Sequence, residues 1–319
     1  MQEKDVIAKE YLKDSRRFAD LLNAEWYQGK SVVLPENIHE KTDGTFRIHK
    51  ASDKIHTAKI AGDVVKEITV KGKPLWVILE IQSDTHFAMP VRIFNEEGMQ
   101  YQEQWRRIRK QHREKRDLKG AEYVSGFGKS DRLIPVVTIV LHLGSDPWMG
   151  PCCLQEMMDL SHYPEHVRKG IGGAPLYLVD VRRYPHPELF QTDLGCVFGF
   201  LKYSGEKDKL RNFIDSHPKE FSHLPEDAYD FISVMAGDRE LAEMKAKNKN
   251  AKGDYNMCQA IRDMIQEGYQ NGHAAGQRSG IHLMKQIYRL QTSGKDRREI
   301  ARICGLSERQ LDDILKEEP

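Results

Sequence analysis

The pattern of apolar and polar residues predicts an amphipathic helix near the start of the chain and a β-hairpin after it. Residues 15–28 place four apolar side chains at helical spacing: Phe18, Leu21, Leu22 and Trp26. Residues 63–70 and 75–82 are rich in β-formers and flank the turn-like segment 71–74. Residues 35–53, between the helix and the hairpin, are polar and predict irregular structure.

The remainder of the chain alternates between helical and strand-like segments. A helical pattern covers 87–117, a nearly all-apolar run at 133–143 predicts a strand covered on both faces, and 176–181 is a second short strand candidate. The pattern is helical again at about 203–240 and beyond the charged segment 245–254. Strands enclosed by helices predict an α/β or α+β fold. We expect one domain at 1–244, a linker at 245–254 and a helical tail at 255–319.

Composition narrows the class of protein without identifying a function. The 319 residues carry a net charge of +1 and 39% hydrophobic residues, so any contact with nucleic acid requires local basic patches. Five cysteines without framework spacing argue against a disulfide scaffold. The charged N-terminus lacks a signal-peptide core, and the longest apolar run is far below the ~20 residues that span a bilayer. These features predict a cytoplasmic protein with no membrane association.

The hairpin contains the residues with the clearest chemical potential. Side chains alternate along a strand, so Glu80 and Gln82 share one face of WVILEIQ while Val77, Leu79 and Ile81 face a core. A carboxylate in such an apolar strand must be paired or bind a metal. Asp63 begins the first strand, and the return strand brings Glu80 towards the same end. Two carboxylates beside an amide form a plausible magnesium site, although a cap for the Asp and an edge charge for the Glu are the simpler interpretations.

Five blocks, in order along most of the chain, resemble the Rpn / YhgA-like group of PD-(D/E)XK nucleases, proteins often labelled as transposases. Asp63, the hairpin and Glu80-x-Gln82 match the nuclease core pattern. The blocks are FADLLNAEWYQGK (18–30), GDVVKEI (62–68), ILEIQSDTHFAMPVR (78–92), YVSGFGKSDRLIPVVTIVLHLGSDPWMGP (123–151) and MCQAIRDMIQEGYQNG (257–272).

The resemblance implies a restriction-endonuclease-like core with a mixed central sheet flanked by helices, and a metal-dependent DNA endonuclease linked to recombination and DNA mobility. Asp63 and Glu80 would hold Mg²⁺, with Mn²⁺ as a substitute. Gln82, in a place where most of the superfamily has Lys, would position the attacking water by hydrogen bonds. The missing positive charge would come from Lys66 or Arg92. The missing Lys also motivates an alternative, a nuclease-fold protein that is catalytically weak or inactive and acts as a DNA-binding or assembly module.

Two departures from the family pattern bear on the site. After MPVR the family continues with an apolar pair and a Tyr-Asp, whereas here Glu96 and Glu97 occupy those places, which leaves the packing of the helix open. The superfamily also tends to carry an acid on its first helix. Asp20 and Glu25 are available there, but a solvated helix face is the favoured interpretation for both.

Two further segments bear on a nucleic-acid partner. A basic stretch on the 87–117 helix could contact the phosphates of double-stranded DNA, or could be a solvated helix face; its five candidate residues are Arg106, Arg107, Arg109, Lys110 and Arg113. Residues 296–315 resemble a helix-turn-helix, with Gly305 at the turn and a Ser307–Gln310 capping box. Acidic residues on its second helix favour a helical interaction module equally, which leaves a homodimer open.

Overall fold

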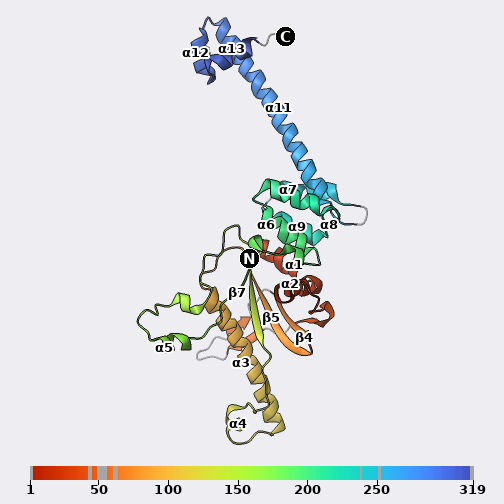
Figure 1. Cartoon of the computed structure of the whole chain (residues 1–319), viewed down its shortest axis with the longest axis vertical. Helices are drawn as coiled ribbons and strands as arrows, with labels where there is room; N and C mark the ends of the chain where they lie inside the picture. The colour runs from red at the N-terminus through yellow and green to blue at the C-terminus, as the bar shows by residue number, and fades with distance from the viewer. Residues whose placement is uncertain are drawn as a thin grey trace. The chain divides into compact units, whose positions relative to one another are not determined.

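The computed structural model describes residues 3–41, 45–48, 56–59, 64–237, 239–250 and 253–316, with the backbone alone for 45–48 and 56–59. The chain divides into two compact units, residues 1–258 and residues 259–319 (Figure 1). The first is a mixed α/β unit built on a five-stranded sheet, and the second is helical. The predicted mixed sheet with flanking helices and a helical C-terminal part is therefore confirmed.

The five-stranded sheet has the order β1-β4-β5-β6-β7. Its strands are β1 (Ile38–Glu40), β4 (Val64–Val70), β5 (Lys73–Gln82), β6 (Val136–His142) and β7 (Tyr177–Asp180). Antiparallel pairing joins β1 to β4 and β4 to β5, whereas β5, β6 and β7 run parallel. The parallel step from β5 to β6 requires a crossover, which α3 (Met89–Lys115) and α4 (Gly120–Ser125) provide.

The β4–β5 hairpin turns more tightly than the sequence suggested. Its loop is Lys71 and Gly72, with φ of 49° and 75°, while Lys73 and Pro74 already belong to β5. Two left-handed residues in succession match the right-handed twist of the flanking strands, and a glycine accepts that conformation without strain. The turn fixes the register along the whole hairpin, from Val70 opposite Lys73 to Val64 opposite Leu79.

The segment 35–53 is not irregular throughout, so this expectation was wrong. It contains a 3₁₀ turn at Pro35–Asn37, the edge strand β1 and the strand β2 (Thr45–Ile48), which pairs with β3 (His56–Lys59) in a separate two-stranded sheet. Of the three residues in β1, Ile38 alone is buried. A strand that buries one side chain leaves almost no periodic signal.

Each face of the large sheet packs against different helices. On one face, Trp76, Ile78 and Val136 pack with Tyr101 of α3, and Val140 packs with Met89 and Ile93 of the same helix. On the other face, α1 (Glu3–Leu12) contacts β5, and Lys66 of β4 donates a hydrogen bond to the Lys13 carbonyl. Beyond the sheet, α3 projects away from the strands and carries α4 near its far end (Figure 1).

The helices opposite α3 are joined by a buried guanidinium. Arg17, near the start of α2 (Ser15–Tyr27), forms ion pairs with Asp193 at 2.8 Å and with Asp227, and lies over the Tyr11 ring. These partners lie on or beside three other helices, so one side chain ties four elements together. This layer of the unit comprises α1 (Glu3–Leu12), α2 (Ser15–Tyr27), α6 (Leu194–Tyr203), α7 (Lys207–Ser216), α8 (Pro218–Phe221), α9 (Glu226–Ala236) and α10 (Arg239–Met244).

The segment expected to be a linker packs against the first unit. Asn248 and Tyr255 are buried, and Lys245 lies 2.8 Å from Glu226 and 2.7 Å from Asp230. The helix α11 (Met257–Thr292) begins two residues after Tyr255.

The second unit forms a small core where the end of α11 meets two short helices. Ile287 of α11 packs against Ile300 and Ala301 of α12 (Arg297–Cys304) and Leu311 of α13 (Glu308–Lys316). The turn at Gly305 adopts φ of 66°, and the Ser307–Gln310 capping box forms as expected. Ile303 of α12 is 42% exposed, outside this core. Within the described ranges, no helix has the length and apolarity needed to cross a bilayer.

Candidate functional site

Glu80 lies in the middle of the sheet, on the face that α3 covers. The register pairs it with Val140 of β6, and its preceding residue, Leu79, pairs with Val64 of β4. Its exposed fraction is 0%. A carboxylate removed from water in this way is stable only with compensating charge or hydrogen bonds.

A guanidinium from α3 provides part of this compensation. Arg92 Nη2 lies 2.7 Å from Glu80 Oε2, and Arg92 Nε lies 3.0 Å from Glu96 Oε1. Glu96 is itself 3% exposed, and its Oε2 atom is buried with no hydrogen-bond partner in the part of the chain that the structure describes. One guanidinium thus serves two buried carboxyl groups.

The two glutamates that depart from the family pattern both face the sheet. Glu96 pairs with Arg92, and Glu97 accepts a hydrogen bond from Thr138 Oγ1 of β6 at 2.8 Å. Burial raises the pKa of Glu97, with hydrogen bonding to Thr138 acting in the opposite direction. Polar contacts therefore replace apolar packing at these two positions: the Glu97 bond joins α3 to β6, and the Glu96 pair lies within α3.

The polar contacts continue along the same side of α3. Lys41, just after β1, donates a hydrogen bond to Gln100 Oε1 at 2.8 Å, and the wholly buried Gln100 lies one helical turn beyond Glu96. Gln104, a further turn along, donates to the Ile134 carbonyl at 3.0 Å. Positions 96, 100 and 104 therefore form a row of buried polar side chains over strands whose facing residues are largely apolar.

Gln82 and His142 lie side by side at the ends of β5 and β6. They pair in the parallel register, and the Gln82 side chain is half-buried. His142 is 1% exposed, its Nε2 lies 2.8 Å from the Asp146 carbonyl, and its Nδ1 has no hydrogen-bond partner among the described residues. A carbonyl only accepts hydrogen bonds, so Nε2 carries a proton. Sequence reasoning missed His142; its signal was a histidine ending an otherwise apolar strand.

Of the predicted site residues, the structure places Glu80 and Gln82 on neighbouring positions of one strand face. Asp63 lies outside the described residues, and the described part of β4 starts at Val64, the next residue. Among the residues that are described, no group of three or more His, Cys, Asp or Glu side chains is arranged to hold a metal ion. The predicted pairing of Asp63 with Glu80 therefore stays a prediction.

Of the two candidates for the missing positive charge, Arg92 lies beside Glu80 and Lys66 does not. Lys66 pairs with Val77 and extends from the opposite face, where burial lowers its pKa. Glu67, the next residue along β4, extends instead from the α3 face, where its carboxylate accepts a hydrogen bond from Trp76. The expectation for Lys66 was wrong because a strand exposes alternate residues to opposite faces.

The two acids that we predicted on the first helix of the nuclease pattern lie on α2 and have structural roles. Asp20 is 4% exposed and accepts hydrogen bonds from the backbone N–H groups of Gln191 and Thr192, at 2.9 and 2.7 Å. Glu25 accepts one from the Tyr177 hydroxyl at 2.9 Å. A solvated helix face was therefore the wrong interpretation for Asp20, which anchors the segment leading into α6.

The basic half of α3 projects beyond the sheet and is held by the segment that follows it. Trp105 Nε1 donates to the Ser125 carbonyl at 3.0 Å. His112 Nδ1 lies 2.7 Å from Asp117 and its Nε2 lies 2.8 Å from Asp131. We call α3 from Trp105 onwards, together with residues 116–131, the α3–α4 arm. Of the five predicted DNA-contacting residues, Arg109 and Arg113 line a pocket in this arm, whereas Arg106, Arg107 and Lys110 do not.

The His112 contacts predict a pH dependence of the arm. Both ring nitrogens face carboxylates, so both must donate, and hydrogen bonds to Asp117 and Asp131 raise the pKa of His112. The stabilisation is fully present below the unfolded value of about 6.5 and is lost as the pH rises through the higher folded pKa. Backbone amides of 117–131 should therefore lose hydrogen-exchange protection as the pH rises above about 6.5.

The variant His112→Gln is the control, because its side chain does not titrate. Its arm should show low protection factors that stay constant over the same interval. Equal pH profiles in the two proteins would contradict the clamp. On the acidic side, hydrogen bonds from the Gly128 N–H and from His112 lower the pKa of Asp131, and bonding to His112 lowers that of Asp117. The contribution of these carboxylates is present above their unfolded pKa and is lost as the pH falls through the folded one.

No family model, curated protein or solved structure matches this chain. Function is therefore argued from the arrangement of the residues.

Proposed function

We propose that this protein is a metal-dependent DNA endonuclease with a core of the PD-(D/E)XK type, in which Asp63 and Glu80 bind Mg²⁺. The observation that carries the proposal is the wholly buried Glu80 carboxylate, which shares a strand face with Gln82 and follows the residue that pairs with Val64. The resemblance of five ordered sequence blocks to the Rpn / YhgA-like group adds to it.

Chain connectivity supports the pairing of the two acids. Asp63 precedes Val64 and Glu80 follows Leu79, and these two inner residues are cross-strand partners. In an antiparallel pair, stepping back along one strand and forward along the other leads to the same end of the hairpin. Each step is one peptide, about 3.8 Å between Cα atoms.

The chemistry of the donors suits a hard cation. Magnesium prefers one or two carboxylates with several retained waters. Glu80 and Glu96 offer buried carboxyl oxygens as ligands, and these two groups share a single cationic partner, Arg92. Asp63 and Glu80 would hold the ion. The Arg92 guanidinium would then change how it shares its contacts between Glu80 and Glu96. When bound, the ion would polarise a phosphodiester oxygen and lower the pKa of a nucleophilic water.

The protein's own groups would complete the site. The Gln82 amide can both donate and accept hydrogen bonds and would orient the water. Arg92, 30% exposed at its side chain, supplies positive charge on the face where most related enzymes use Lys. The basic α3–α4 arm would contact the DNA backbone, because phosphate contacts are made by clustered Lys and Arg.

Cleavage of supercoiled plasmid by the purified protein tests the proposal. We expect nicked and linear DNA with magnesium or manganese and intact plasmid with EDTA. Cutting that continues in EDTA would contradict the metal requirement, and the absence of cutting with either metal would contradict the enzymatic proposal.

A second candidate function is favoured by the Arg92–Glu80 ion pair. In the folded chain a protein cation is already in place against the predicted metal ligand, as in a nuclease-fold protein that binds DNA or assembles without cutting it. Calorimetric titration with Mn²⁺ discriminates between the two. Binding that is lost in Glu80→Gln supports the enzyme, whereas no carboxylate-dependent binding in the native chain supports the non-catalytic module.

A further inference from the structure

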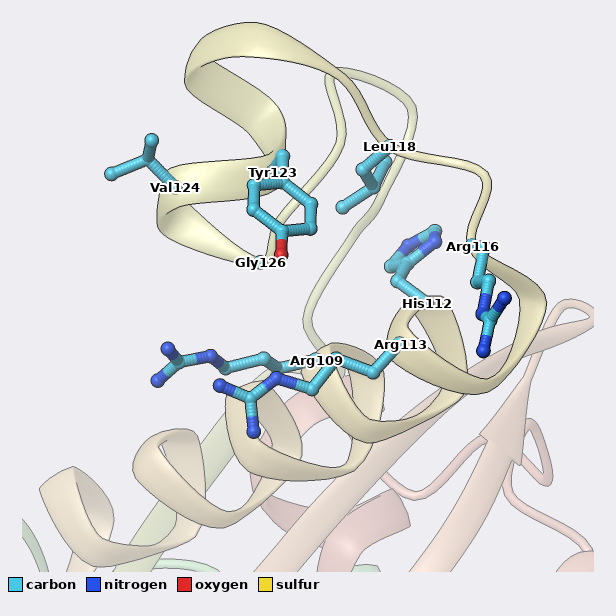
Figure 2. A pocket seen from close by; sticks show the side chains of 8 residues that line it. All are labelled: Arg109, His112, Arg113, Arg116, Leu118, Tyr123, Val124 and Gly126. Carbon is cyan, nitrogen blue, oxygen red and sulfur yellow. The ribbon is translucent and has the colours of Figure 1, made fainter.

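A basic pocket lies between the exposed half of α3 and the short helix α4. Its volume is about 540 Å³, within the range of roughly 300–1,000 Å³ typical of small-ligand sites. The arginines Arg109, Arg113 and Arg116 form one side, and Tyr123, Val124 and Leu118 lie across from them (Figure 2). The pocket therefore combines cationic groups with an aromatic and aliphatic surface.

The positive charge of this pocket is not neutralised locally. Among the described residues, Arg109, Arg113 and Arg116 have no carboxylate within ion-pair distance. The acids nearby are engaged by groups other than these arginines: Asp117 and Asp131 contact His112, which also lines the pocket, and Glu122 accepts a hydrogen bond from the Lys129 N–H at 2.7 Å. Three guanidinium groups are thus available for an anion such as a phosphate, which arginine binds through paired N–H donors.

The side of the pocket across from the arginines exposes an aromatic ring that packing within the arm does not account for. Tyr123 is 70% exposed and Val124 is 78% exposed, although both are large apolar residues on a six-residue helix. Figure 2 shows the Tyr123 ring above the Arg109 and Arg113 side chains, with its hydroxyl directed towards them. A ring in this position can stack on a nucleobase whose phosphate lies on the arginines.

The pocket is held in shape before any ligand binds. Gly126 ends α4 with φ of 66°, and a Cβ there would lie 2.4 Å from Arg109 Cγ, so only glycine permits this close approach of α4 to α3. The Trp105–Ser125 hydrogen bond and the His112 contacts fix the same segment on both sides of the pocket. Such pre-organisation lowers the entropy lost on binding.

We propose that this pocket binds one unpaired nucleotide of a nucleic-acid strand, with its phosphate on Arg109 and Arg113 and its base against Tyr123. A base within a duplex is covered on both faces by its neighbours, so it would have to leave the stack to contact the ring. The arm would then recognise single-stranded or frayed DNA at a distance from Glu80. This inference deepens the proposed nuclease function, because it names the form of nucleic acid that the enzyme engages.

Fluorescence anisotropy in EDTA tests the proposal with a labelled oligothymidylate of about ten nucleotides and a blunt duplex of equal length. We expect tighter binding of the single strand. Tyr123→Ala and Arg113→Gln should each weaken that binding about tenfold. Lys207→Gln is the matched control, since it removes one exposed charge from α7, outside the pocket and outside the arm, and should change binding by less than about twofold.

Three outcomes would overturn the proposal. Unchanged single-strand binding by Tyr123→Ala removes the base contact. An equal loss in Lys207→Gln and Arg113→Gln means a diffuse electrostatic surface. Tighter binding of thymidine monophosphate than of the oligonucleotide, measured by competition, assigns the pocket to free nucleotides. Because EDTA prevents metal-dependent cutting, these results are independent of the cleavage assay, and either proposal can fail while the other holds.

Discussion

Replacement of Glu80 by glutamine is expected to lower magnesium-dependent DNA cleavage by about a thousandfold, while the protein remains folded. Loss of a carboxylate ligand removes metal stabilisation of developing charge, which is worth several kcal/mol, and each 1.36 kcal/mol is a factor of ten in rate. Glutamine keeps the shape of the buried side chain. Arg92 keeps Glu96 as a partner at 3.0 Å, so no buried cation is left alone.

The controls for this experiment come from the same hairpin. Asp63→Asn should show a similar loss, because both carboxylates are proposed to bind one ion. Glu67→Gln removes an acid on the same sheet face whose carboxylate accepts a hydrogen bond from Trp76 at 2.7 Å, and it should cut at the native rate. Thermal unfolding checks that all three variants fold. If Glu80→Gln cut plasmid as fast as the native chain, the proposed active site would be wrong.

Local periodicity was sufficient to predict the hairpin and its faces. Alternation along 75–82 correctly placed Glu80 and Gln82 opposite Val77, Leu79 and Ile81, because a strand repeats every two residues. The same alternation excludes Lys66 from the Glu80 face once the register with Val77 is known. The register depends on the turn, where Lys71 adopts a left-handed conformation. Lysine does not favour that conformation, so the residue type gives no indication of it.

The contacts that complete the site are between segments distant in sequence, and periodicity does not encode them. The sequence made Arg92 a candidate for the missing positive charge, but its position beside Glu80 depends on how α3 packs on the sheet. Glu97 looked like a defect in an apolar pattern, since its partner Thr138 becomes a neighbour only in the fold, whereas the pair of Arg92 and Glu96 has the i, i+4 spacing of one helix and was open to prediction. Buried polar groups of this kind carry specificity through hydrogen bonds rather than through hydrophobicity.

Replacement of Arg92 by methionine is expected to lower the free energy of unfolding by roughly 2–4 kcal/mol. Removing one partner of a buried ion pair typically costs about 3–5 kcal/mol, because the remaining charge stays buried, and the partial exposure of Arg92 reduces this cost. Methionine keeps most of the aliphatic packing, so the loss reports mainly on the Glu80 and Glu96 carboxylates. Urea unfolding at neutral pH in EDTA measures it.

The control for this variant is Arg107→Met on the same helix. Arg107 pairs with Glu103 at 3.0 Å through a side chain that is 48% exposed, so its replacement should cost about 0.5 kcal/mol or less. An equal loss of unfolding free energy in the two variants would mean that the Arg92 contacts stabilise the fold no more than an exposed ion pair does.

Metal ions should distinguish the Arg92 variant from the native protein. With the competing guanidinium removed, Mg²⁺ or Mn²⁺ is expected to bind the carboxylates more tightly and to restore part of the lost stability. A ligand present at a hundred times its dissociation constant stabilises a protein by about 2.7 kcal/mol. The recovery should therefore exceed the effect of the same metal concentration on the native chain, and it should be absent from Arg107→Met. If metal did not stabilise Arg92→Met at all, the cluster around Glu80 would be a structural ion pair without capacity for a cation, and the non-catalytic alternative would be favoured.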